Sequence, residues 1–378
     1  MTRRVPFAAA APSTRHRIRR GVFVALALSL LLPGCHETPR PRPKTPAEVR
    51  AELARLMPAG IRDRSGWAAD IQAAFAALKI DPSKANLCSV VAVTEQESSF
   101  SADPHVPGLG NIALEEIDRR VSAHHIPPLV ARAALQISAP DGRTWEQHIA
   151  AATTERELSD VYEAMIDRVP MGTRLLANAN PVHTGGPMQV SVTFAEALAR
   201  DKDYPYPVEG SIRHEVFTRR GGVYFGTAHL LGYRASYKQP IFRFADYNAG
   251  WYASRNAAFQ NMVSIATGIP LELDGDLVNY GGGASRTETA IGSLSQELGM
   301  DTSKIHSALA KSETLDFEKT DLYREIAQLA ERSAGHALPR ARLPEIRLQS
   351  PKITRRLTTA WFAQRVDQRY RRCMARAK

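Results

Sequence analysis

The most informative apolar pattern of the chain runs from residue 81 to residue 100. Asp81 and Pro82 predict a helix start, because Asp can cap free backbone amides and Pro is tolerated in the first helical turn. The positions that follow recur at spacings of three and four, on one helical face: Leu87, Val90, Val91, Thr94 and Glu97. Glu97 therefore extends the face that we expect to be buried, while Glu95 lies about 200° around the helix from it.

A carboxyl group at the end of an apolar stripe has a chemical consequence. Burial disfavours the charged form, so the pKa of Glu97 should be raised. A raised pKa is what a general acid needs near neutral pH. The alternative is that Glu97 occupies the last, exposed turn of an ordinary core helix, and the pattern alone leaves both interpretations open.

Helical signals dominate the rest of the chain, so we predict a mainly α-helical fold. The capping boxes Thr45–Glu48 and Thr154–Glu157 predict two helix starts. A second helix is expected after the one that begins at Thr45, with an apolar face made of Trp67, Ile71, Phe75 and Leu78. Further helices are expected at about 112–121, 131–137, 285–298, 303–311 and 318–333, with an arginine-rich helix near residue 378.

Composition and charge narrow the classes of function. The 378 residues are 44% hydrophobic and 23% charged, which is typical of a soluble globular protein with one large or two moderate domains. The formal net charge is +10, but six arginines lie within residues 1–34, a segment without acidic residues. The remaining 43 basic and 39 acidic residues do not favour nucleic acid as a partner.

The arginine-rich N-terminus leads into an apolar run at residues 21–32, which is short for a membrane span and typical of a secretory signal. The segment Leu32–Cys35 (Leu-Pro-Gly-Cys) resembles a bacterial lipobox, in which the cysteine is lipidated and becomes the first mature residue. The resemblance implies a signal peptide at residues 1–34 and a lipid anchor on Cys35. The prolines that follow predict an extended tether at residues 35–45.

The residue after this cysteine bears on location. It is His36, so the Asp that retains enteric lipoproteins in the inner membrane is absent. The resemblance therefore implies a protein anchored to the outer membrane and facing the periplasm. The alternative is a plain signal peptide with an incidental Cys35.

Two cysteines, Cys88 and Cys373, remain in the predicted mature chain. An exported protein meets an oxidising compartment, so a disulfide between them is permitted. It would join the C-terminal tail to the helix of Glu97 and contribute up to about 4–5 kcal/mol by closing a long loop. The alternative is a buried free thiol and a frayed tail, because geometry cannot be deduced from spacing.

Three short stretches follow the order and context of the lytic transglycosylase domain: Glu97–Phe100 (Glu-Ser-Ser-Phe), Gly186–Val190 (Gly-Pro-Met-Gln-Val) and Asp246–Gly250 (Asp-Tyr-Asn-Ala-Gly). A helix-like segment, Gly222–Leu231, precedes the last of them. Over about residues 80–265 the chain resembles that lysozyme-like domain, which cleaves bacterial peptidoglycan. As a whole, the chain also resembles an uncharacterised proteobacterial lipoprotein family.

The resemblance implies a lysozyme-like helical domain at residues 46–268, with a large insertion at about 105–180, and a C-terminal helical region at residues 269–378. The chain departs from the family at Pro187, where the family has Leu and a backbone N–H. It departs again in the 89 residues from Glu97 to the second motif, where the family uses a few tens. We expect the insertion to lie near the cleft, where it shapes substrate choice or covers the site.

The resemblance also implies a mechanism. Glycosidases usually have two carboxyl groups, whereas a single acid fits substrate-assisted chemistry through the sugar's own 2-acetamido group. Glu97 would protonate the oxygen between N-acetylmuramic acid and N-acetylglucosamine. The ionised Glu97 would then take the proton of the muramic 6-hydroxyl, whose oxygen closes a 1,6-anhydro ring.

By resemblance, five more residues would surround the substrate: Ser98, Met188, Gln189, Tyr247 and Asn248. Ser98 would lie near the acetamido group, Met188 and Gln189 would line the subsites, Tyr247 would hydrogen-bond Glu97, and Asn248 would contact the glycan. Four of the five have a structural alternative. Ser98 can bond its own helix, Met188 and Tyr247 can be core residues, and Gln189 can lie on the surface.

The expected partners are peptidoglycan strands and, through the lipid, a membrane. No cofactor is implied, and the histidines do not share a metal-ligand spacing. Two other classes of function stay open: a glycan-binding lipoprotein without turnover, and an envelope assembly factor that docks a protein partner through its C-terminal helices. The arginines of the final helix indicate a solvated face or a surface for anionic envelope polymers.

Overall fold

The computed structural model describes residues 42–168, 180–279, 281–348 and 357–377. Its elements are mainly α-helices with a few two-residue strands, which confirms the predicted helical class. The predicted signal peptide, Cys35 and most of the predicted tether lie outside the described residues. The chain divides into two units, Met1–Pro43 and Lys44–Lys378, and all the helices described belong to the second. None of these helices is long and apolar enough to cross a membrane.

The first hydrophobic cluster is built from α1 (Pro46–Leu56), α2 (Arg64–Leu78), α3 (Lys84–Glu97), α9 (Val192–Asp201), α11 (Arg219–Leu231), α12 (Pro240–Ala249) and α18 (Thr359–Arg376). Helix α3 is its centre, because Val90–Val93 are fully buried. The predicted start at Asp81 is wrong. Ser83 is the N-cap, and its side chain accepts the N–H of Asn86.

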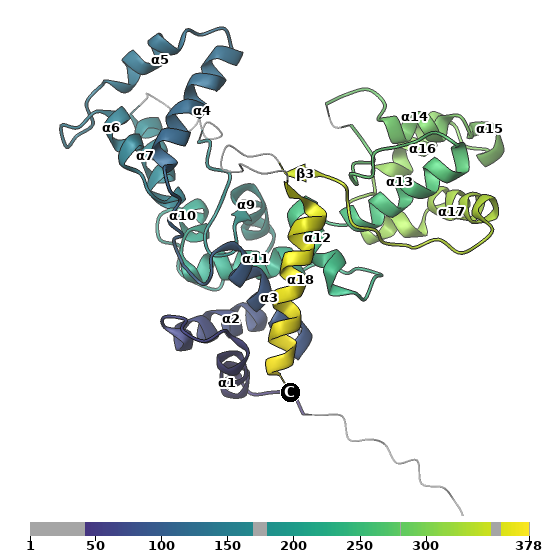
Figure 1. The fold of residues 1–378 in the computed structure, drawn as a ribbon, viewed down its shortest axis with the longest axis horizontal. Helices are drawn as coiled ribbons and strands as arrows, with labels where there is room; N and C mark the ends of the chain where they lie inside the picture. Colours follow the sequence, from purple (N-terminus) through teal and green to yellow (C-terminus); the bar gives the residue numbers. More distant parts are fainter. Residues whose placement is uncertain (1–41, 169–179, 280, 349–356, 378) are drawn as a thin grey trace, which may run out of the picture. The chain divides into compact units, whose positions relative to one another are not determined.

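Helix α18 packs against α3 and α12 (Figure 1). It runs antiparallel to α3, because Lys84 Nζ at the start of α3 donates to the carbonyl of Ala377, just past α18, at 2.9 Å. One turn further along α3, Cys88 and Cys373 form a disulfide, so the pairing that the sequence left open is confirmed. The predicted boundary at residue 268 is therefore wrong for α18, which belongs to the core that carries Glu97.

The predicted insertion has its own hydrophobic cluster. Its helices are α4 (Leu109–Ala123), α5 (Pro128–Leu135), α6 (Trp145–Ala151) and α7 (Glu155–Asp167). Val182 and Phe217 also belong to this cluster, so the insertion is packed onto segments that flank the second motif. Both predicted capping boxes are confirmed, with Thr154 capping α7 and Thr45 capping α1.

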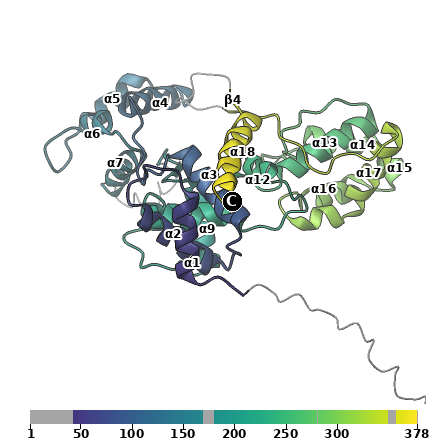
Figure 2. The same ribbon diagram turned by 60° about the horizontal axis from the view of Figure 1, so that its bottom comes forward.

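A third cluster is formed by α13 (Ala253–Thr267), α14 (Arg286–Gly292), α15 (Ser295–Leu298), α16 (Thr302–Leu309), the 3₁₀ helix η1 (Leu315–Lys319) and α17 (Asp321–Ala334) (Figure 2). Helix α13 is its central helix and packs against α17. The single helix predicted over 285–298 is wrong, because it breaks between α14 and α15. The short strands β3 (Arg347–Leu348) and β4 (Leu357–Thr358) pair antiparallel.

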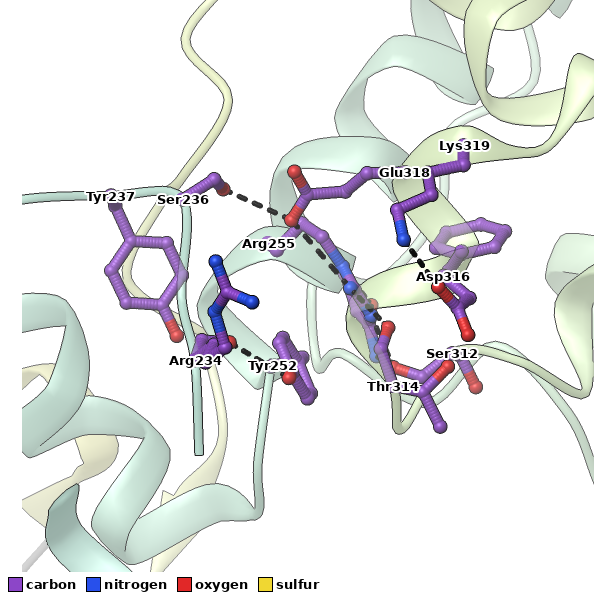
Figure 3. A network of polar contacts seen from close by, with 12 residues as sticks. Arg234, Ser236, Tyr237, Tyr252, Arg255, Ser312, Thr314, Asp316, Glu318 and Lys319 are labelled. Atoms are coloured by element: carbon purple, nitrogen blue, oxygen red, sulfur yellow. Dashed lines mark hydrogen bonds and ion pairs between the residues drawn. The ribbon is translucent and has the colours of Figure 1, made fainter. Parts of the chain in front are cut away.

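A buried arginine holds this third cluster together. Arg255 of α13 is fully buried and donates to the carbonyls of Thr314, at 2.8 Å, and of Ser312 (Figure 3). Its guanidinium lies over the rings of Tyr252 and Phe317, 4.3 and 5.1 Å from their centres. A buried cation is tolerated only when its donors are satisfied. Arg255 therefore fixes the segment before η1 against α13.

Candidate functional site

Glu97 is the last residue of α3 and is half-buried. Its pKa is raised from 4.5 to about 8, first by burial and then by the negative charge of Glu155, while the positive charge of Arg369 acts in the opposite direction. The raised pKa predicted from the apolar stripe is confirmed. A carboxyl group of this kind keeps its proton at neutral pH.

The second motif is the turn of a β-hairpin. Strand β1 (Thr184–Gly185) pairs antiparallel with β2 (Val190–Ser191), and residues 186–189 connect them. Gly186 has a φ of 72°, and a Cβ at this position would lie 2.0 Å from the carbonyl oxygen of Val216. Only glycine therefore fits this turn.

The hairpin turn packs onto two glycines of α11. A Cβ on Gly222 would lie 2.4 Å from the ring of Pro187, and a Cβ on Gly226 would lie 2.6 Å from the side chain of Met188. Pro187, which replaces the Leu of the transglycosylase motif, thus packs directly against α11 at Gly222. The side chain of Met188 is fully buried in the first cluster. The prediction that this side chain lines a sugar subsite is wrong, and its carbonyl has a different role.

That carbonyl accepts a hydrogen bond from the Tyr247 hydroxyl, at 2.6 Å. The predicted hydrogen bond from Tyr247 to Glu97 is therefore corrected, since the single phenolic proton goes to Met188. Tyr247 nevertheless lies near the acid, because burial and the charge of Glu97 together raise its pKa well above 10. The third motif is thus bonded to the second motif beside Glu97.

Glu155 is a site residue that the sequence analysis missed. It is the first residue of α7, is 6% exposed, and accepts a hydrogen bond from Gln189 Nε2 at 2.7 Å. Its charge also acts on Glu97, so the insertion brings a second carboxylate to the candidate acid. The capping box at Thr154 located the helix start, but no local pattern indicated where this start would lie.

Two predicted ligand-binding residues have structural partners. Ser98 Oγ donates to the carbonyl of Thr94, at 3.1 Å, which is the structural alternative stated for it. Asn248 is exposed, and its Oδ1 accepts a hydrogen bond from Thr359 Oγ1 at the start of α18, at 2.8 Å. The amide N–H groups of Asn248 are not used in that contact, so they can serve a glycan hydroxyl.

A group of aromatic rings begins at Tyr247 and continues through His229. The ring of His229 lies 5.0 Å from that of Tyr247, and both Phe194 and Trp251 lie close to His229. The three rings line a cavity of about 690 Å³ that also reaches Asn256. Burial lowers the pKa of His229 to about 4, so this histidine is neutral at pH 7.

Comparisons with known proteins agree on one family. A family model described as "Protein of unknown function (DUF1615)" matches residues 60–376, which include the three motifs, the predicted insertion and all of α18. The chain belongs to the DUF1615 family. It is also 49% identical to "Uncharacterized protein YaiW" of Escherichia coli (strain K12) over 355 residues, 93% of this chain and 97% of that protein. No solved structure matches the chain.

In this DUF1615 protein, Glu155 of α7 and Tyr247 of α12 lie near the carboxyl group of Glu97. Glu97 can donate a proton, Glu155 disfavours its loss, and Gln189 of the hairpin is hydrogen-bonded to Glu155. Within the described part of the chain, no group of three or more His, Cys, Asp or Glu side chains is placed to hold a metal ion. The arrangement is chemically suited to general acid–base catalysis.

Proposed function

We propose that this DUF1615 protein is a peptidoglycan lytic transglycosylase with a lysozyme-like catalytic core. It would cleave the β-1,4 bond between N-acetylmuramic acid and N-acetylglucosamine and leave a 1,6-anhydro end. The observation that carries the proposal is the state of Glu97. This half-buried carboxyl has a pKa of about 8 and lies near Tyr247 of the third motif, whose hydroxyl is bonded to the second motif.

The proposed reaction needs one acid that works twice. Glu97 gives its proton to the glycosidic oxygen, the bond from that oxygen to C1 of the muramic sugar breaks, and the acetamido group assists at C1. Ionised Glu97 then takes the proton of the 6-hydroxyl while O6 bonds to C1 in place of the acetamido oxygen. The carboxyl regains its proton and no water is consumed.

Glu155 would support this cycle without contacting the sugar. Its negative charge opposes the ionisation of Glu97, so the acid is ready at neutral pH. Its hydrogen bond orients the amide of Gln189, whose oxygen can then face a sugar hydroxyl. The insertion would thus set the acid and one subsite contact together.

We place the protein at the outer membrane, anchored through Cys35 and facing the periplasm. The disulfide between Cys88 and Cys373 supports an oxidising compartment. The Leu-Pro-Gly-Cys segment supports the anchor. The catalytic unit begins with α1, so the residues between the anchor and Thr45 would act as its tether.

The test is the digestion of purified sacculi by the mature protein, with mass spectrometry of the released muropeptides. We expect 1,6-anhydro ends from the wild type and at least a hundredfold loss of product for Glu97→Gln. Glu115→Gln, an exposed site on α4, is the matched control and should retain the activity. Binding to sacculi without any released product would overturn the proposal in favour of a glycan-binding lipoprotein.

A further inference from the structure

Arg369 of α18, which has no role in the proposed reaction, is a partly buried arginine with a donor left unsatisfied in the described part of the chain. Its side chain is only 16% exposed and lies against the end of α3. Its Nη1 donates to the carbonyl of Arg365 at 3.2 Å. Its Nε is buried and finds no hydrogen-bond acceptor among the described residues. A guanidinium group carries five N–H donors, so most of its capacity is not used.

The nearest carboxylate is already engaged by a different arginine. Glu95 Oε1 accepts a hydrogen bond from Arg372 at 3.0 Å, whereas Arg369 Nε lies 3.8 Å from the same oxygen, beyond hydrogen-bond reach. Glu97 supplies little of the counter-charge at neutral pH, because its pKa is raised to about 8. Arg369 therefore lies next to the candidate acid with an ion pair to Glu95 at 3.8 Å, but without a hydrogen-bonded anion among the described residues.

The helix adds positive charge on the same face. Arg365, Arg369, Arg372 and Arg376 recur at spacings of four, three and four, which aligns them along one side of α18. The first and third of these repel Arg369, and its main compensation comes from Glu95. Asp367, the acid within this stretch of α18, pairs with Arg371 at 2.7 Å. This face therefore has an excess of positive charge beside Glu97.

The position of Arg369 is fixed from both ends of α18. Cys373, one turn away, is covalently bonded to Cys88 of α3. Thr359, at the first turn, bonds Asn248 of the third motif. A partly buried cation that is held in place with one buried donor unsatisfied costs free energy, and a bound anion would lower that cost. An arginine fork matches the geometry of a carboxylate.

We propose that Arg369 binds a carboxylate of the substrate beside Glu97, so that the preferred substrate is an anionic glycan strand. The inference rests on the proposed function and deepens it by naming a substrate class. Two sources carry this group in peptidoglycan: the lactyl carboxylate of muramic acid without its stem peptide, and the carboxylates of the stem peptide. Both present the same chemistry to a guanidinium group.

The experiment measures the dissociation constant of the mature Glu97→Gln protein, which cannot turn over, for three purified glycan preparations. They are peptide-free strands, the same strands with their carboxylates converted to neutral amides, and peptide-bearing strands. We expect amidation to weaken binding by about tenfold or more. Tighter binding to peptide-free strands would assign the lactyl group, and tighter binding to peptide-bearing strands would assign the stem peptide. Equal constants for free and amidated strands would overturn the proposal.

Variants locate the effect. Adding Arg369→Gln should abolish the difference between free and amidated strands, and Arg369→Lys should retain part of it, because a lysine keeps the charge but not the fork. Arg371→Gln is the control on the same helix, since Arg371 is 77% exposed and faces Asp367. A carboxylate preference that survives Arg369→Gln would overturn the assignment. The ligand comparison itself needs no change in α18, so it does not depend on the folding of these variants.

The failure of this inference is distinguishable from failure of the proposed function. If wild-type protein releases anhydro ends equally fast from free and amidated strands, the carboxylate site is refuted and the activity stands. If binding depends on the carboxylate but no anhydro ends form, the activity is refuted and the site stands.

Discussion

Two charged residues act on Glu97 in opposite directions, and both come from segments remote in sequence. Glu155 raises the pKa of Glu97 and Arg369 lowers it, while burial is the larger cause of the shift. The proposed acid donates only while it is protonated, so kcat/KM should stay level below pH 8 and fall as the pH rises through the pKa of Glu97.

Glu155→Gln tests this balance. The amide oxygen can still accept the hydrogen bond from Gln189, but the negative charge is lost, so the pKa of Glu97 should fall. We expect the alkaline limb of kcat/KM to move down by about 0.5–1 pH unit, with lower activity at pH 8. Glu163→Gln on the same helix, where the carboxylate faces Arg213, is the control. An unmoved limb in Glu155→Gln would contradict the electrostatic role.

At the scale of elements, α18 is joined to α3 by a bond that closes a loop spanning 285 positions. The double variant Cys88→Ser, Cys373→Ser should lower the free energy of unfolding by about 2–5 kcal/mol, because the unfolded chain is no longer constrained. Urea unfolding monitored by circular dichroism measures the loss.

Reduction of the wild type is the matched comparison for this double variant. It should lower the unfolding midpoint to that of the double variant, and the double variant should not respond to reductant. A wild-type midpoint that is insensitive to reduction would show that the link adds no stability.

Elements defined by local signals were predictable. The stripe through Val90 and Thr94 located Glu97 on the buried face of α3, and Thr154 marked the start of α7. The side-chain partners were not predictable, because Glu155 and Arg369 reach the site only through packing between helices. Tyr247 shows the same limit. Its place beside Glu97 followed from the motif order, but its hydrogen bond goes to a backbone carbonyl that no residue type could indicate.

For the molecule as a whole, the sequence analysis ended the first domain at residue 268 and set an insertion apart at about 105–180, and the structure has three hydrophobic clusters. The chain leaves the first cluster at α12, builds the third, and returns to the first with α18. Composition and proline-rich linkers mark where a segment is exposed. They do not show where the chain goes afterwards, and this return was therefore missed.

The proposed lipid anchor on Cys35 determines where the whole molecule is found in the cell. Cys35 lies in the first of the two units of the chain and the helices described belong to the second, so Cys35→Ala should leave the melting temperature unchanged. The variant should move from the membrane fraction to the soluble periplasmic fraction, because the lipid is the proposed attachment. Fractionation of cells followed by immunoblotting measures this. Retention of Cys35→Ala in the membrane fraction would contradict the lipid anchor.

The disulfide between Cys88 and Cys373 also makes the completion of the fold depend on the cellular compartment. Thiols in the cytosol are kept reduced, so in a chain that is exported as we propose, the two sulfur atoms would join only after export. Until then, nothing covalent secures the arginine face beside the acid. The protein would then fix the arginine face of α18 beside Glu97 only in the periplasm, where the proposed substrate lies. Newly made copies awaiting export would lack this fixed surface.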